Sequence, residues 1–134
     1  MTNSVKNLKS CSERLAKCPI HPYPRFYAFR DRGILYLSKK LYKNAIDDLT
    51  SAIEITYKKD LFIYWPGIKT KLFKFRSRVY FLRGFAYIKK QNLDKGIEDL
   101  TKSIELYPKI INENKSKFKM LPPEIRGLLK FFDI

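Results

Sequence analysis

Two stretches of this sequence decide the expected fold: FRDRGILYLSKKLYKNAIDDLTSAIEI at residues 29–55 and YFLRGFAYIKKQNLDKGIEDLTKSIEL at residues 80–106. Aligned with an offset of 51 residues, they are identical at ten positions. The identical pairs are Arg32/Arg83, Gly33/Gly84, Tyr36/Tyr87, Lys39/Lys90, Ile46/Ile97, Asp48/Asp99, Leu49/Leu100, Thr50/Thr101, Ile53/Ile104 and Glu54/Glu105. Such self-similarity indicates one supersecondary unit used twice.

Each copy contains two helical patterns joined by a short polar turn. In the first copy, Phe29, Gly33 and Tyr36, and then Ile46 and Leu49, recur at spacings of three and four. This spacing is typical of amphipathic helices, which bury one face. The sequence therefore predicts two helical hairpins and an all-α fold.

The two hairpins are expected to close at small residues. Gly33 and Gly84 cost each helix about 1 kcal/mol relative to alanine, and their recurrence indicates a close approach between helices. Asn44 and Asp94 lie near the starts of the second helices, where a short polar side chain can satisfy free backbone N–H groups. The small residues expected to face the two glycines are Ala45, Ala52, Gly96 and Ser103.

This pattern resembles the tetratricopeptide repeat, a helical hairpin of about 34 residues. The signature residues are Phe29, Arg32, Gly33, Tyr36, Ala45 and Leu49 in the first copy, and Tyr80, Arg83, Gly84, Tyr87, Gly96, Leu100 and Pro108 in the second. Tyr57 stands where the first copy would carry the proline, and the offset leaves about 17 inserted residues. The resemblance implies an α-α superhelix of hairpins with flanking amino-terminal and carboxy-terminal helices.

The whole chain, 1–134, is expected to form a single domain, since its length suffices for one compact core. Its expected parts are an N-terminal helix and linker (4–24), a first hairpin (26–55), a basic aromatic insertion (56–76), a second hairpin (77–110) and a C-terminal capping helix (111–134). In the insertion, we expect the second helix of the first copy to continue through 56–63 and the next helix to begin near Ile68. Two lengthened helices would then meet at a Trp65-Pro66-Gly67 turn that projects from the core.

Repeated charges predict two ion pairs within the hairpins, Arg32 with Asp48 and Arg83 with Asp99.

The two cysteines lie before the first hairpin. When the repeat pattern is extended by one repeat toward the N-terminus, Cys11 and Cys18 fall at positions that small buried residues occupy in the first copy. We therefore expect both thiols to be buried. With His21 they supply too few ligands at the wrong spacing for a structural zinc site. No metal and no other cofactor is expected.

The sequence disfavours catalysis. It holds one histidine and no glycine-rich phosphate loop, and its acidic residues follow the repeat rather than forming a separate cluster. It also shows no signal segment and no apolar run of membrane-spanning length, which predicts a cytoplasmic protein.

The formal net charge of +15 is concentrated in residues 56–90, which carry ten basic residues and one acidic residue. The basic patch comprises Lys58, Lys59, Lys69, Lys71, Lys74, Arg76 and Arg78, interleaved with aromatic side chains. A solvated basic face, which AT-rich coding alone can produce, is the first interpretation, followed by a protein contact. Nucleic-acid binding, or contact with an anionic membrane, through 56–90 is the alternative function, with the membrane the least expected.

The resemblance also implies a concave groove lined by the first helices of successive hairpins. Candidate groove residues are Tyr27, Arg30, Ile34 and Leu37 from the first copy and Arg78, Phe81, Phe85 and Ile88 from the second. Ile34 stands where a carboxylate clamp would need asparagine, which disfavours that mode. We therefore expect a scaffolding module that binds a protein or peptide partner with apolar and acidic residues. Two alternatives are that Leu128, Leu129 and Phe132 fill the groove, or that the chain self-associates.

Overall fold

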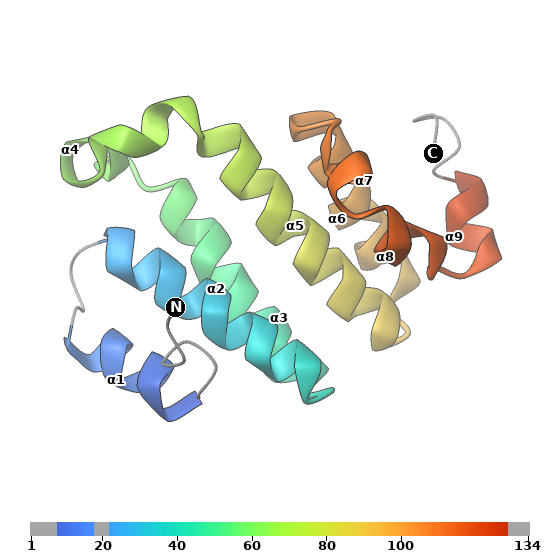
Figure 1. Ribbon diagram of the computed structural model, residues 1–134, viewed down its shortest axis with the longest axis horizontal. Coiled ribbons are helices and arrows are strands. Elements are labelled where there is room, and N and C mark those ends of the chain that lie inside the picture. Colours follow the sequence, from blue (N-terminus) through green and yellow to red (C-terminus); the bar gives the residue numbers. More distant parts are fainter. Residues whose placement is uncertain (1–7, 18–21, 129–134) are drawn as a thin grey trace.

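The computed structural model describes residues 8–17 and 22–128, and within them every regular element is a helix. The first hairpin pairs α2 (Pro22–Ser38) with α3 (Tyr42–Thr56), and the second pairs α5 (Leu72–Lys89) with α6 (Leu93–Leu106). Helix α3 packs against α5, so the two hairpins stack (Figure 1). The all-α class and the hairpin repeat are confirmed.

The turns of the two hairpins have the same backbone geometry. Lys40 and Gln91, which occupy equivalent positions in the two copies, both adopt a left-handed conformation, with φ of 61° and 69°. In each turn the next N–H donates to a carbonyl five residues back, Leu41 to Tyr36 and Asn92 to Tyr87, both at 2.9 Å. These bonds satisfy carbonyls that the end of the first helix would leave unpaired.

The helix starts differ from the sequence expectation. The cap of α6 is Asn92, whose side chain accepts a hydrogen bond from the Lys95 N–H at 3.4 Å, while Asp94 lies in the first turn. Helix α3 begins after Leu41 with no side-chain cap, and Asn44 lies within the helix. The expected capping roles of Asn44 and Asp94 are therefore wrong.

Both repeated glycines lie at close helix crossings. A Cβ added at Gly84 would stand 3.0 Å from the Gly96 carbonyl oxygen, and one at Gly33 would stand 2.9 Å from the Leu49 side chain. The Ala45 carbonyl oxygen is next, at 3.6 Å from that Gly33 position. Two small residues that face each other inside the second hairpin are Ser77 and Ser103, whose hydroxyls each donate to the other's carbonyl.

The two predicted ion pairs are confirmed. Arg32 contacts both carboxylate oxygens of Asp48, and Arg83 contacts both of Asp99, at 2.7 and 2.8 Å in each case. Hydrogen bonding to Asp48 raises the pKa of Arg32 despite partial burial. Each arginine therefore ties the two helices of its own hairpin together.

Helix α1 (Leu8–Lys17) packs along α2, in the place of the second helix of a preceding hairpin. Cys11 is fully buried there, as expected, and Ser12 accepts a hydrogen bond from Arg32 at 3.1 Å. Cys18 and His21 lie outside the described residues. Within 8–17 and 22–128, none of the helices combines the length and apolar character needed to cross a membrane.

The insertion folds differently from the two lengthened helices expected. Helix α3 ends at Thr56 instead of continuing to residue 63, and a separate short helix, α4 (Leu61–Tyr64), follows. A 3-10 helix, η2 (Pro66–Thr70), precedes α5, which begins at Leu72 rather than near Ile68. Leu61, Trp65 and Ile68 are buried, so the segment is anchored in the core, while Pro66 and Gly67 of the turn are exposed.

The segment after the second hairpin forms three short helices, α7 (Ile110–Glu113), α8 (Lys115–Lys119) and α9 (Pro123–Leu128). Their buried side chains join a cluster with the second hairpin: Phe81, Ile88, Leu100, Ile104, Ile110, Phe118, Leu121 and Ile125. This segment therefore covers the last hairpin of the stack (Figure 1). Leu129 and Phe132 lie outside the described residues.

Candidate partner-binding groove

An apolar groove opens between α2, α5 and α8. Its volume is about 360 Å³, and it is lined by Ile34, Leu37, Ser38, Tyr42, Phe81, Leu82, Phe85, Lys89, Lys117 and Met120. Ile34 and Met120 are exposed at 41% and 68%. Large apolar side chains thus remain open to solvent in a hollow that the fold has already shaped, the usual character of a binding site.

Positive charge borders this groove. The ammonium of Lys89 lies 5.9 Å from the centre of the Phe85 ring, and that of Lys117 lies 5.9 Å from the Phe81 ring. The groove lining includes no acidic side chain. A ligand that carries a carboxylate beside apolar side chains would therefore match both the bordering lysines and the apolar lining of the groove.

Four of the eight candidate groove residues line this hollow, and four do not. Ile34, Leu37, Phe81 and Phe85 do. Ile88 is buried and points toward α6, where its side chain packs against Gly96.

The remaining three candidate residues make contacts elsewhere. Arg30 pairs with Asp31 at 2.8 Å and lies over the Tyr27 ring. Arg78 pairs with Glu113 of α7 at 3.2 Å, and Tyr107 donates a hydrogen bond to the same carboxylate at 2.9 Å. These two contacts lower the pKa of Glu113.

Side chains of the insertion fill the other end of the space between α2 and α5. Phe26 of α2 stacks on Phe75 of α5 with ring centres 5.6 Å apart, and Trp65 lies 5.6 Å from Phe26 and 5.8 Å from Phe75. Tyr27 lies 5.8 Å from the same tryptophan. We call this the closed end, and the apolar groove the open end.

The basic patch does not act as one set of free charges. Arg76 donates to the Thr56 carbonyl at 2.7 Å and lies 3.8 Å from the centre of the Tyr57 ring, while Arg78 has its Glu113 partner. Lys74 lies over the Tyr107 ring at 5.4 Å. The other four members, Lys58, Lys59, Lys69 and Lys71, are exposed and make no ion pair with residues that the structure describes.

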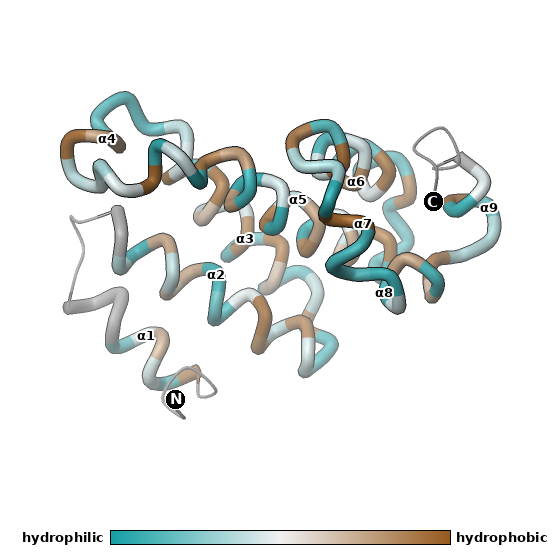
Figure 2. Tube along the Cα trace, turned by 45° about the horizontal axis from the view of Figure 1, so that its top comes forward, coloured by the Kyte–Doolittle hydropathy of each residue, from teal (hydrophilic) through white to brown (hydrophobic). Residues whose placement is uncertain are grey.

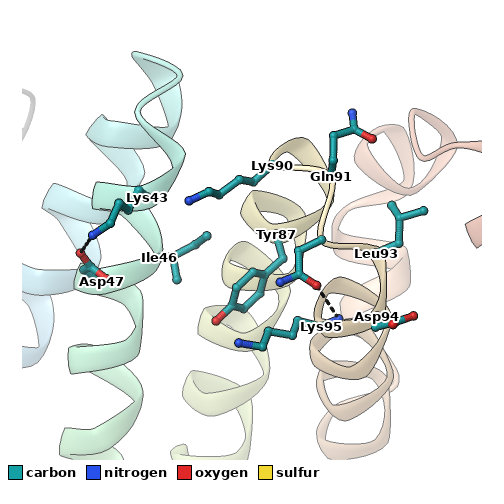
Figure 3. A pocket seen from close by; sticks show the side chains of 10 residues that line it. Lys43, Ile46, Asp47, Tyr87, Lys90, Gln91, Leu93, Asp94 and Lys95 are labelled. Carbon is teal, nitrogen blue, oxygen red and sulfur yellow. Dashed lines mark hydrogen bonds and ion pairs between the residues drawn. The ribbon is translucent and has the colours of Figure 1, made fainter.

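A second, polar hollow of about 710 Å³ lies between the start of α3 and the turn of the second hairpin, and sequence reasoning did not single it out. Figure 3 shows Lys43 turned toward Asp47 on its own helix, with Lys90 and Lys95 on the facing side. Its charged side chains are exposed and of both signs, and its apolar lining is limited to Ile46, Tyr87 and Leu93. The lining of this hollow therefore indicates less clearly than that of the apolar groove what kind of ligand would bind there.

Two like hairpins, stacked through α3 and α5 and flanked by further helices, define a helical-repeat protein. Residues 77–110, which include most of α5 and all of α6, match the family model of the tetratricopeptide repeat. The chain therefore contains a tetratricopeptide repeat, a unit that generally mediates protein–protein interactions and is typically non-catalytic. No curated protein and no solved structure matches the chain.

Proposed function

We propose that this protein is a non-catalytic interaction module whose open end binds an amphipathic segment of a partner protein. The observation that carries the proposal is the apolar groove between the first helices of the two hairpins, bordered by Lys89 and Lys117. The preferred segment is a helix with one or two large apolar anchors and a nearby acidic residue.

The size and character of the groove support a short anchor rather than a long extended peptide. A hollow of about 360 Å³ accommodates one or two side chains of leucine or phenylalanine size. The closed end leaves no equivalent space further along the two helices, because Trp65 already lies against Phe26 and Phe75. Affinity therefore depends on a few apolar contacts at one place.

The test is a screen of the full chain against amphipathic helical peptides that are either acidic or neutral, read by fluorescence polarisation. Ile34→Asp should weaken the best acidic peptide by about tenfold or more, because it places a charge among the apolar anchors and repels the ligand. Leu93→Asp is the matched control, since Leu93 is equally exposed but lies outside the groove.

Two further results would decide the mode of binding. Lys117→Glu should reduce the preference for acidic peptides. Higher ionic strength should also reduce that preference, while the binding of neutral peptides changes little because apolar contacts dominate it. Equal loss in the Ile34 and Leu93 variants, or no peptide selected at all, would reject this groove as the binding site.

A further inference from the structure

Helix α4 directs its side chains to opposite sides. Leu61 at its start and Trp65 directly after it are buried in the core of the first hairpin. Phe62 and Ile63 between them point outward and are exposed at 44% and 76%. Figure 2 shows apolar colour at α4, which lies at one extremity of the molecule in Figure 1.

Lysines surround this exposed apolar segment. Lys58 and Lys59 precede α4, Lys69 lies in η2, and Lys71 precedes Phe73, which is itself exposed at 62%. We call this set the basic apolar tip: Phe62, Ile63 and Phe73 with Lys58, Lys59, Lys69 and Lys71. Asp60 is the one acidic residue of the sequence between 56 and 90, so the charge of the tip is strongly positive.

The exposure of the tip is fixed by the core beneath it. Leu61, Trp65, Ile68 and Leu72 are buried on the side of the insertion that faces the closed end, and they hold α4 and η2 in place. The outward side chains are therefore presented by a rigid base, and the packing of the core does not require them to be apolar.

We propose that the basic apolar tip docks on the surface of an anionic membrane, with Phe62, Ile63 and Phe73 entering the interface and the four lysines contacting lipid phosphates. Aliphatic and aromatic side chains beside lysines suit a lipid surface, because they bury in the interfacial layer while the ammonium groups reach the headgroups. This docking uses a different surface from the apolar groove, so it stands independently of the proposed function.

The other partners that this surface suggests fit it less well. Protein interfaces are depleted in lysine, whereas the free cations of the tip are all lysines. Single-stranded nucleic acids stack bases on aromatic faces along a basic groove, but the most exposed apolar side chain here is the aliphatic Ile63. A second copy of the chain would bring two positively charged tips together.

The test measures co-sedimentation of the full chain with vesicles of phosphatidylcholine alone or mixed with phosphatidylserine. We expect binding to the mixed vesicles, and an Ile63→Ser/Phe73→Ser variant should lower the partition coefficient by about tenfold or more. Leu93→Ser, which removes an exposed leucine elsewhere, should bind as the wild type does. Trp65, the single tryptophan, should be quenched by brominated phospholipids because it underlies the tip.

Charge variants complete the test. Lys69→Gln/Lys71→Gln should lower binding by about thirtyfold, whereas Lys115→Gln/Lys119→Gln on α8 should have a much smaller effect. Failure to bind the mixed vesicles overturns the proposal, as does binding to single-stranded RNA in place of vesicles. Vesicle binding that depends on the lysines but not on Ile63 and Phe73 also overturns it, because apolar docking is then absent.

Discussion

The closed end and the open end lie between the same two helices, yet one is filled and the other is not. At the closed end, Phe26 and Phe75 meet each other and the insertion adds Trp65 against both. At the open end, Ile34 and Phe85 line a groove that no part of the insertion enters. The contrast shows that the insertion is part of the core at one end, and that a partner has room only where the chain has not supplied side chains of its own.

The largest expected effect comes from emptying the closed end. Trp65→Ala should lower the free energy of unfolding by about 3–5 kcal/mol, because it removes a buried aromatic side chain and leaves a cavity. Ile34→Ala at the open end should cost less than about 1 kcal/mol, since that side chain is already exposed. Urea unfolding of both variants measures the difference, and equal costs would contradict the contrast between the two ends.

The contrast also assumes that the two hairpins are alike, so that the insertion alone distinguishes the ends. Arg32→Met and Arg83→Met each leave a nearly buried carboxylate without its partner and should each cost about 2–3 kcal/mol. Melting temperatures should fall by similar amounts in the two variants. An unchanged melting temperature in either would show that its ion pair contributes nothing to stability.

A smaller effect should reveal where the hairpins differ. Gly84→Ala places a methyl group 3.0 Å from a backbone carbonyl oxygen and should destabilise by about 1–2 kcal/mol. Gly33→Ala places its methyl group 2.9 Å from Cγ and Cδ2 of the fully buried Leu49, but no backbone oxygen is nearer than 3.6 Å. Because a side chain can shift more readily than a backbone carbonyl, its cost should be smaller. Gly127→Ala has open space around it and serves as the control for helix propensity. Thermal unfolding that ranks Gly33→Ala as the costlier change would contradict this account.

The smallest effect concerns pH at the junction of α3, the insertion and α5. Burial, and then the hydrogen bond with Tyr57 at 3.2 Å, raise the pKa of Tyr80 to about 12. The folded state holds this proton more tightly than the unfolded chain, whose tyrosine has a pKa of about 10. The contribution of Tyr80 is therefore complete below pH of about 10 and is lost as the pH rises toward about 12.

Comparison with Tyr80→Phe isolates this contribution, because the variant lacks only the Tyr80 hydroxyl. The difference in unfolding free energy between wild type and variant should change over that pH interval, with the wild type losing stability. A constant difference across the interval would show that the hydroxyl pair does not couple to folding.

The sequence was sufficient to predict the hairpins because their information is local and repeated. Spacings of three and four define each helix, and the matching pairs Arg32–Asp48 and Arg83–Asp99 share one separation. The second copy therefore acts as a check on the first. The same reasoning identified Ile34, Leu37, Phe81 and Phe85, which the structure brings together.

The insertion was not predictable in this way, because its packing partners are distant in the sequence. Nothing around Trp65 indicates that it will lie against Phe26 and Tyr27. Helix α5 also carries apolar residues around much of its circumference. The sequence pattern therefore did not distinguish the face toward α6 from the face toward α2. Ile88 was assigned to the groove, but it lies on the face toward α6. Arg78 was assigned to the groove from the register of the repeat, which gives no information on its partner Glu113 because that residue lies beyond the repeat.

The two hairpin turns also bear on how stable this molecule is able to become. Lys40 and Gln91 hold a left-handed backbone that side-chain-bearing residues adopt at a cost and glycine adopts freely. Because both are exposed, glycine at either position would relieve that cost without disturbing the core, by about 1 kcal/mol each. The natural chain therefore lies below the maximum thermal tolerance that its own architecture permits.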